Sequence, residues 1–349
     1  MSVRDADLQE RRNQQILADV VRAYIETGEP VSSRAISRRL GEHLSPATVR
    51  NVMADLEEGG YLSQPHTSAG RIPTTAAYRL FAQTVSAQAR ISAEDEVWIR
   101  NEMAGAQDPA ESAERAVRVL ARISKGLGIV VSPPIGKAIV EQLRFVLLPD
   151  RRVLTVIIGP GGATRDKVLQ TERSFTQDEL DRTGNYLNHH YSGWTLAAIR
   201  QDLLSNLARD RERYDELMVA ALALCDPKLL AESPSRQVFV EGAAQMAGST
   251  EFADQTQFRE LLEAIEEKHK LVALLNHCID SPEPVLVQIG LEQIATDGSN
   301  LALISAPYTA QDQAQGSLGV LGPTRMQYER AITAVAFVAR LLSDNLDRS

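Results

Sequence analysis

The chain has 349 residues, of which 44% are hydrophobic and 24% are charged, with a formal net charge of −9. This composition excludes an intrinsically disordered chain, and the length suggests two or three domains at about 150 residues each. No run approaches the roughly 18 to 20 consecutive apolar residues of a membrane-spanning helix, and the opening "MSVRDADLQERRNQQ" has no apolar signal core. We therefore expect a cytoplasmic protein with no membrane partner.

The charge is unevenly distributed along the chain. Residues 1–90 carry 11 arginines, no lysine and 10 acidic residues, whereas the remainder carries 26 basic and 36 acidic residues. Between positions 30 and 54 there are four arginines and a single acidic residue. This asymmetry indicates that part of the N-terminal segment faces a polyanion, although the whole chain is acidic.

Two helices are predicted first. In "DLQERRNQQILADVVRAYIETGEPV", apolar residues recur at steps of three and four, which predicts an amphipathic helix that stops at Gly28 and Pro30. The next stretch, "SSRAISRRLG", predicts a short helix with Ser32 or Ser33 as its N-cap and Gly41 after its end. Its arginines point away from the apolar side of the helix.

A third helix is predicted with Ser45 as N-cap and Pro46 at its first position, where a missing amide proton costs nothing. Its inward-facing residues follow the i, i+3, i+4, i+7 pattern and are Val49, Val52, Met53 and Leu56. Its opposite face carries small residues around one guanidinium and one carboxamide, namely Ala47, Arg50, Asn51 and Ala54.

That outer face is typical of a helix that reads a DNA groove. Small side chains allow close approach, arginine can form two hydrogen bonds with guanine, and asparagine can do so with adenine. Asp55, Glu57 and Glu58 would repel phosphates, so only the N-terminal half is expected to enter the groove. The alternative is an ordinary solvated face of a three-helix bundle.

The stretch "GGYLSQPHTSAGRIPTTAAYRLF" leaves the third helix through Gly59 and Gly60. A strand at Tyr61, a turn and a second strand at Ile72 then give the order of a winged helix. Arg71, beside the turn, would suit a phosphate or a narrow minor groove. Three further turn residues can donate to phosphate oxygens or be plain loop residues: His66, Thr67 and Ser68.

The rest of the chain predicts a mixed α and β body. Residues 91–127 favour helix, and "QLRFVLLPDRRVLTVIIG" predicts two strands with a turn at Pro149 and Asp150, with "KVLQTERSF" as a possible third strand. Helical patterns dominate from Gln177 to about Leu230. A strand, "QVFVEG", and a helix, "FRELLEAIEEKHKLVALLNHC", follow. The chain then gives strands in "PVLVQIG", "LALISAP" and "SLGVLGP", and a final helix in "RMQYERAITAVAFVARLLSDNL".

Glycine-rich stretches do not predict a phosphate site. The "GPGG" at residues 159–162 lacks the lysine and hydroxyl residue of a phosphate-binding loop. Gly316, Gly319 and Gly322 do not fit a dinucleotide-binding motif after a strand. We expect both stretches to be turns.

Histidines and cysteines do not form a catalytic pattern. His189 and His190 are adjacent, so on a helix they diverge by about 100° and make a poor metal pair. His277 and Cys278 have no nearby acid in a recognisable order, and Cys225 and Cys278 lack CxxC spacing. We expect buried, unpaired cysteines, no enzyme activity, no cofactor and no metal.

Two motifs together resemble one known family. The stretch "SPATVRNVMADLEEGGYLSQPHTSAGRIPT" and, far along the chain, "GSLGVLGPTRMQYERAI" at residues 316–332 are similar to the winged-helix segment and the C-terminal signature of HrcA, the bacterial heat-inducible transcription repressor family. The resemblance implies an α+β multidomain fold: a winged helix-turn-helix, a GAF-like domain, and a mainly helical dimerisation domain inserted into it.

These implications give expected boundaries. We expect a winged helix at 1–88, a helical linker at 89–127, a GAF-like domain in two segments at 128–174 and 276–349, and the inserted domain at 175–275. The resemblance also implies a homodimer that binds an inverted-repeat operator of chaperone operons, is released on heat shock and is assisted by the GroEL chaperonin. The alternative is a metabolite-controlled winged-helix transcription factor with a ligand-binding GAF-like domain.

The expected DNA contacts fall into two groups. Residues expected to read bases are Ala47, Thr48, Arg50 and Asn51. Residues expected to hold the DNA backbone or the minor groove are Arg34, Arg38, Arg39, His66, Thr67, Ser68 and Arg71.

Overall fold

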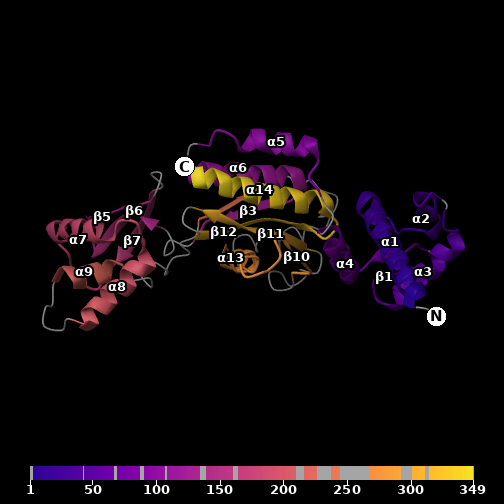
Figure 1. The fold of residues 1–349 in the computed structure, drawn as a ribbon, viewed down its shortest axis with the longest axis horizontal. Helices are drawn as coiled ribbons and strands as arrows, with labels where there is room; N and C mark the ends of the chain where they lie inside the picture. Colours follow the sequence, from indigo (N-terminus) through magenta and orange to yellow (C-terminus); the bar gives the residue numbers. More distant parts are fainter. Residues whose placement is uncertain are drawn as a thin grey trace.

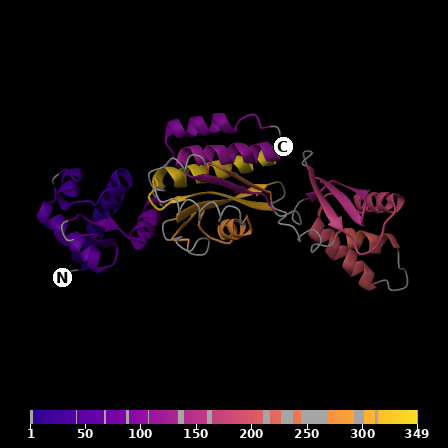
Figure 2. The same cartoon turned by 180° about the vertical axis from the view of Figure 1, so that it is seen from behind.

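The fold consists of three bodies in a row, visible from both sides in Figures 1 and 2. An N-terminal helical body lies at one end, a central body holds the largest sheet, and a smaller α/β body lies at the other end. The α+β multidomain class is therefore as expected. The computed structural model describes residues 3–41, 43–66, 69–86, 90–106, 108–133, 139–159, 164–209, 216–225, 237–243, 268–291, 301–310 and 314–348.

The N-terminal body has four helices and a short hairpin. In chain order these are α1 Val3–Thr27, α2 Ser33–Arg39, α3 Pro46–Glu58, β1 Leu62–Ser63, β2 Ile72–Pro73 and α4 Thr75–Ser86. The predicted caps are confirmed, since the Ser32 side chain accepts from the amide of Ala35 and the Ser45 side chain from that of Thr48. Three helices followed by an antiparallel hairpin form the predicted winged helix.

The predicted inner faces of these helices are buried. On α3 the four apolar residues are all at most 7% exposed: Val49, Val52, Met53 and Leu56. They pack with residues of α1 and α2 such as Ile16, Leu17 and Ile36. Burial of one stripe per helix leaves the opposite face of α3 outward, which is the face expected to meet DNA.

The central body is built on a five-stranded antiparallel sheet with the order β10-β11-β12-β3-β9. Its strands are β3 Leu127–Val131, β9 Val238–Glu241, β10 Leu286–Ile289, β11 Leu301–Ala310 and β12 Ala314–Pro323. Its helices are α5 Ala93–Met103, α6 Pro109–Ser124, α13 Lys268–Asn276 and α14 Tyr328–Arg348. All five residues of β3 are buried, because α6 and α14 cover one face of the sheet and α13 covers the other.

The third body contains a three-stranded antiparallel sheet and three helices. Its elements are β4 Ile139–Val140, β5 Gln142–Leu148, β6 Arg152–Ile158, β7 Thr164–Gln170, α7 Gln177–Tyr191, β8 Trp194–Thr195, α8 Leu196–Arg209 and α9 Glu216–Leu224. The predicted hairpin between β5 and β6 is confirmed, and Asp150 and Arg151 in its turn have φ of 61° and 55°. Leu143, Phe145 and Val153 pack with the helices in a core of their own.

This arrangement corrects the expected domain boundaries. Residues 142–170 form the small sheet rather than part of the segment expected at 128–174 for a GAF-like domain, because their inward side chains pack on α7 to α9. In contrast, β9 and α13 lie in the central body, since β9 pairs with β3. The insertion therefore lies between β3 and β9. The linker expected at 89–127 is also part of the central body, because α6 packs on the sheet.

The turn expected at Gly316, Gly319 and Gly322 is likewise corrected. Gly316, Gly319 and Gly322 lie inside β12, where the sheet packs closely. A Cβ atom at Gly319 would come within 2.5 Å of the carbonyl oxygen of Ile304 in β11, so the strand needs glycine for proximity rather than for a turn. In the "GPGG" stretch, residues 160–162 lie outside the described residues.

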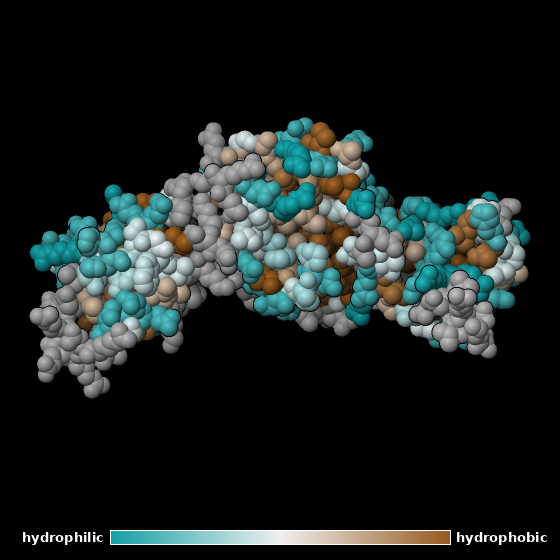
Figure 3. Space-filling model, viewed as in Figure 1, coloured by the Kyte–Doolittle hydropathy of each residue, from teal (hydrophilic) through white to brown (hydrophobic). Residues whose placement is uncertain are grey.

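Hydrophobic residues gather on the central body in the view of Figure 3. Cys225 and Cys278 are both buried and free, as expected, and burial raises the pKa of their thiols to about 12 and about 11.

Among the described helices, none combines the length and apolarity needed to cross a membrane. In the same residues, no cluster of three or more His, Cys, Asp or Glu is placed to hold a metal ion.

Candidate nucleic-acid interface

The outer face of α3 presents the residues expected to read bases. Ala47, Arg50 and Asn51 are exposed, and Thr48 is half-buried. Within the described part of the chain, the Arg50 side chain has no hydrogen bond or ion pair. An exposed guanidinium without an internal partner loses no protein contact when it binds a new acceptor.

The start of α3 is capped by the Ser45 side chain. The Ser45 hydroxyl accepts from the amide of Thr48 at 3.1 Å, and the two hydroxyl groups lie 2.9 Å apart. The first turn contains no acidic residue. The partial positive charge of this helix end is therefore not neutralised locally, which favours an approaching phosphate group.

The arginines of α2 divide into two kinds. Arg34 and Arg38 are exposed and, among the described residues, their side chains make no hydrogen bond or ion pair. Arg39 instead donates two hydrogen bonds to Glu26 of α1, both at 2.7 Å. These bonds raise the pKa of Arg39 and hold the pKa of Glu26 below its usual range. Arg39 therefore joins α2 to α1 in this structure, and its guanidinium is not free for DNA.

The wing is fixed to both α3 and the segment before α2. Arg71 donates to Glu57 of α3, with distances of 2.9 Å from Nε and 2.6 Å from Nη2 to the same carboxylate oxygen. The backbone of Arg71 also pairs with Val31 through two hydrogen bonds of 2.8 and 2.9 Å. The Arg71 side chain is only 19% exposed, so its main contact here is with the protein.

The tip of the wing is described in part. His66 is exposed, and its carbonyl oxygen accepts from the amide of Ala69 at 2.8 Å. Gln64 donates its side-chain amide to the carbonyl of Ala69 at 2.9 Å, which closes the turn. Thr67 and Ser68, both expected to contact phosphates, lie outside the described residues.

Sequence reasoning missed the acidic partners of two arginines. Glu57 was expected only to repel phosphates, and Glu26 had no expected role. Each lies 13 or 14 residues from its arginine, a separation at which no helical or strand spacing signals contact. The glycine at position 70 is a sequence feature that marks how close the wing lies to the segment before α2. A Cβ atom at this position would lie 2.5 Å from the carbonyl oxygen of Val31.

Comparisons with known proteins agree with this geometry. Residues 9–87 match the family model described as "Winged helix-turn-helix transcription repressor, HrcA DNA-binding". Residues 111–332 match the model described as "HrcA protein C terminal domain". The two models together cover most of the chain.

Individual relatives match over nearly their whole length. The chain is 38% identical over 337 residues to the heat-inducible transcription repressor HrcA of Geobacter sulfurreducens, covering 96% of this chain and 98% of that protein. It is 35% identical to the protein of the same name from Syntrophobacter fumaroxidans, covering 97% of each. A crystal structure of a hypothetical protein shares the fold, with a TM-score of 0.64, 22% identity, and coverage of 97% of this chain and 98% of that one.

Proposed function

The chain belongs to the HrcA family of heat-inducible transcription repressors, and we propose that it acts as a homodimer on an inverted-repeat operator of chaperone genes. The family consists of DNA-binding repressors, so the chain is not an enzyme. Its place of action is the cytoplasm, where operators are accessible.

The observation that carries the proposal is the outer face of α3. Arg50 and Asn51 are exposed there, beside the small Ala47, and the buried stripe of the same helix fixes their direction. An arginine and an asparagine so placed can each form paired hydrogen bonds with a base edge in the major groove. Thr48, at the first turn, reaches the same groove. These four residues read the operator sequence.

The DNA backbone is held by the residues around that helix. Arg34 and Arg38, which are exposed and whose side chains have no partner among the described residues, bind phosphates, and the N-terminal end of α3, whose first turn has no acidic residue, adds to their attraction. His66 at the wing contacts the adjacent backbone, together with the two residues that follow it in the sequence, Thr67 and Ser68. Arg39 and Arg71 hold the winged helix together through Glu26 and Glu57 and contribute to DNA binding indirectly.

A second subunit supplies the second half-site. One short helix contacts few base pairs, and dimers of such modules bind half-sites roughly 34 to 36 Å apart. The small sheet supports self-association, because its face away from α7 to α9 includes Val146 and Val168, which are 43% and 46% exposed. Apolar side chains on one open sheet face are typical of a surface that a partner covers.

Heat releases the repressor, and the GroEL chaperonin helps return it to the binding state. A dimer that loses its geometry loses both half-site contacts together, so a modest structural change has a large effect on affinity. The similarity to repressors named heat-inducible supports the heat response. The chaperonin's part rests on the family resemblance alone.

The test is a footprint of the purified protein on the promoters of chaperone genes from its own genome, with and without chaperonin. The expected result is protection of two symmetric half-sites on the same face of the duplex, strengthened by the chaperonin after heating. Protection of no site, or equal affinity for promoter and random DNA, would refute the proposal.

A further inference from the structure

The winged helix is docked on the central body through an aromatic anchor. Tyr328, at the start of α14, is 1% exposed. Its ring lies 6.1 Å from the rings of both Tyr78 and Phe81 of α4, tilted against the first and edge-on to the second. The Tyr328 hydroxyl donates to the carbonyl of Thr324 at 2.8 Å, so this buried polar group is satisfied. The anchor places α4 against α14.

Three arginines cross the same boundary. Arg22 of α1 contacts Glu329 of α14, with Nε and Nη2 at 3.0 and 2.9 Å from one carboxylate oxygen. Arg325 donates to the carbonyl of Ile25, in the last turn of α1, at 3.2 Å. Arg79 of α4 donates to the carbonyl of Ile289 at 2.8 and 3.1 Å. We name these contacts and the aromatic anchor together the seam.

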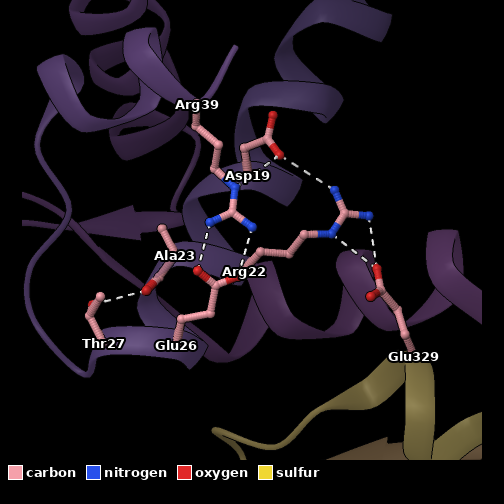
Figure 4. A network of polar contacts seen from close by, with 7 residues as sticks. All are labelled: Asp19, Arg22, Ala23, Glu26, Thr27, Arg39 and Glu329. Carbon is pink, nitrogen blue, oxygen red and sulfur yellow. Dashed lines mark hydrogen bonds and ion pairs between the residues drawn. The ribbon is translucent and has the colours of Figure 1, made fainter. Parts of the chain in front are cut away.

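The seam is connected to the DNA-facing helices. Arg22 also contacts Asp19 at 3.4 Å, and Asp19 lies 3.9 Å from Arg39 of α2, which is bound to Glu26. Figure 4 shows this network running from α2 through α1 to Glu329. Because α2 packs on α3, a chain of direct contacts joins the central body to the face that bears Arg50.

The polar side of the seam is open to solvent. A cavity of about 410 Å³ lies beside it, lined among others by Arg22, Arg90, Asp95 and Glu329. The Arg22 and Glu329 side chains are 38% and 52% exposed. Salt therefore screens this pair, whereas the buried Tyr328 contact is insensitive to salt. The seam thus combines a buried aromatic anchor with a partly exposed ion pair.

We propose that the seam sets the orientation of α3 relative to the rest of the subunit, with Arg22 and Glu329 as positioning residues for operator recognition. The inference rests on the proposed function. An operator with two half-sites is bound well only if both α3 helices are presented at the right separation and angle. A winged helix that swivels on Tyr328 keeps its own fold and its affinity for any one DNA segment, but it no longer matches the fixed spacing.

The experiment compares the full-length wild type with Glu329→Gln, which removes the charge and keeps the side-chain shape. The matched control is Glu96→Gln, which removes an equal charge from a pair with Arg100 that lies within α5 and does not cross the seam. Affinity is measured for the operator found by footprinting, for the same operator with its half-sites moved apart by half a helical turn, and for random DNA.

The wild type and Glu96→Gln are expected to prefer the natural spacing. Glu329→Gln is expected to lose on the order of 5-fold in affinity for the natural spacing while binding random DNA as before. An unchanged spacing preference in Glu329→Gln, or equal losses in both variants, overturns the inference while the proposed function stands. A wild type without any preference for the inverted repeat overturns the proposed function, and this inference with it.

Discussion

Arg71 of the wing and Glu57 of α3 form an ion pair, with Nη2 of the arginine 2.6 Å from Oε2 of the glutamate. The side chains are 19% and 32% exposed, so the pair is half-buried between the two elements. The sequence predicts a phosphate or minor-groove contact for Arg71, whereas the structure gives this side chain a partner inside the protein. The pair keeps the wing at a fixed angle to the helix that faces DNA.

Replacing Glu57 with Gln tests that role. We expect Glu57→Gln to lower the free energy of unfolding by about 1 kcal/mol, because a charged hydrogen bond in a half-buried site is lost. Chemical denaturation and operator titration are the measurements. Glu58→Gln, an exposed neighbour on the same helix, is the matched control for the change in charge. If Glu57→Gln raised the affinity for the operator more than Glu58→Gln did, the result would mean that Arg71, once released from Glu57, binds DNA.

The cap of α3 gives a second prediction. Ser45→Ala removes the acceptor of the Thr48 amide and is expected to cost about 1 kcal/mol of stability. We expect Ser45→Ala to lower the affinity for the operator more than the affinity for random DNA. The reason is that the first turn of α3 carries Ala47 and Thr48, which are proposed to read bases. Ser45→Thr keeps the cap and is expected to behave like the wild type. Equal behaviour of the alanine and threonine variants in thermal melting and DNA titration would contradict this account.

The close approach of the wing to Val31 gives a third prediction. Gly70→Ala places a methyl group 2.5 Å from a backbone oxygen, so the two segments must separate, and we expect a loss of about 1 to 3 kcal/mol. Gly59→Ala is the control, since Gly59 has φ of −73° and its Cβ would come no closer than 3.3 Å to the Tyr61 ring and 3.4 Å to the carbonyl oxygen of Asp55. Urea unfolding compares the two. A Gly70→Ala protein as stable as Gly59→Ala would show that the contact is absent in solution.

The ion pair between Asp95 and Arg330 predicts a dependence on pH. Hydrogen bonds from Arg330 lower the pKa of Asp95 from its ordinary value of 3.8, although burial opposes the shift. A carboxyl group with a lowered pKa stabilises the folded state above its ordinary pKa, and this contribution is lost as the pH falls through the lowered value. The difference in free energy of unfolding between wild type and Asp95→Asn is therefore constant above about pH 5 and shrinks in stronger acid. A difference that grows as the pH falls would contradict the assignment.

The sequence predicts local features of this fold well. Ser32, Ser45 and Pro46 act at the helix starts as expected, and the four apolar residues of α3 are buried as their spacing predicts. The hairpin around Asp150 is also confirmed. These features depend on contacts within about four residues or across one turn, where periodicity and turn chemistry are direct signals.

Long-range pairing could not be predicted in the same way. The strand β3 pairs with β9 and β12, whose residues lie more than 100 positions away, and nothing in the five residues of β3 specifies those partners. The domain boundaries were misplaced for this reason. The ion pairs of Arg39 and Arg71 also needed the tertiary structure, because an isolated arginine in a basic segment looks the same whether it binds a phosphate or a carboxylate.

The most direct measurement compares Arg50→Ala with the wild type on the operator and on random DNA at one salt concentration. Arg182→Ala, an exposed arginine of α7 in the small body, is the control for the change in charge. We expect Arg50→Ala to lose about 1 to 3 kcal/mol on the operator and little on random DNA, and to tolerate substitution of one base pair in each half-site. Equal losses on operator and random DNA, or an Arg50→Ala protein that matches Arg182→Ala, would contradict base reading by this face of α3.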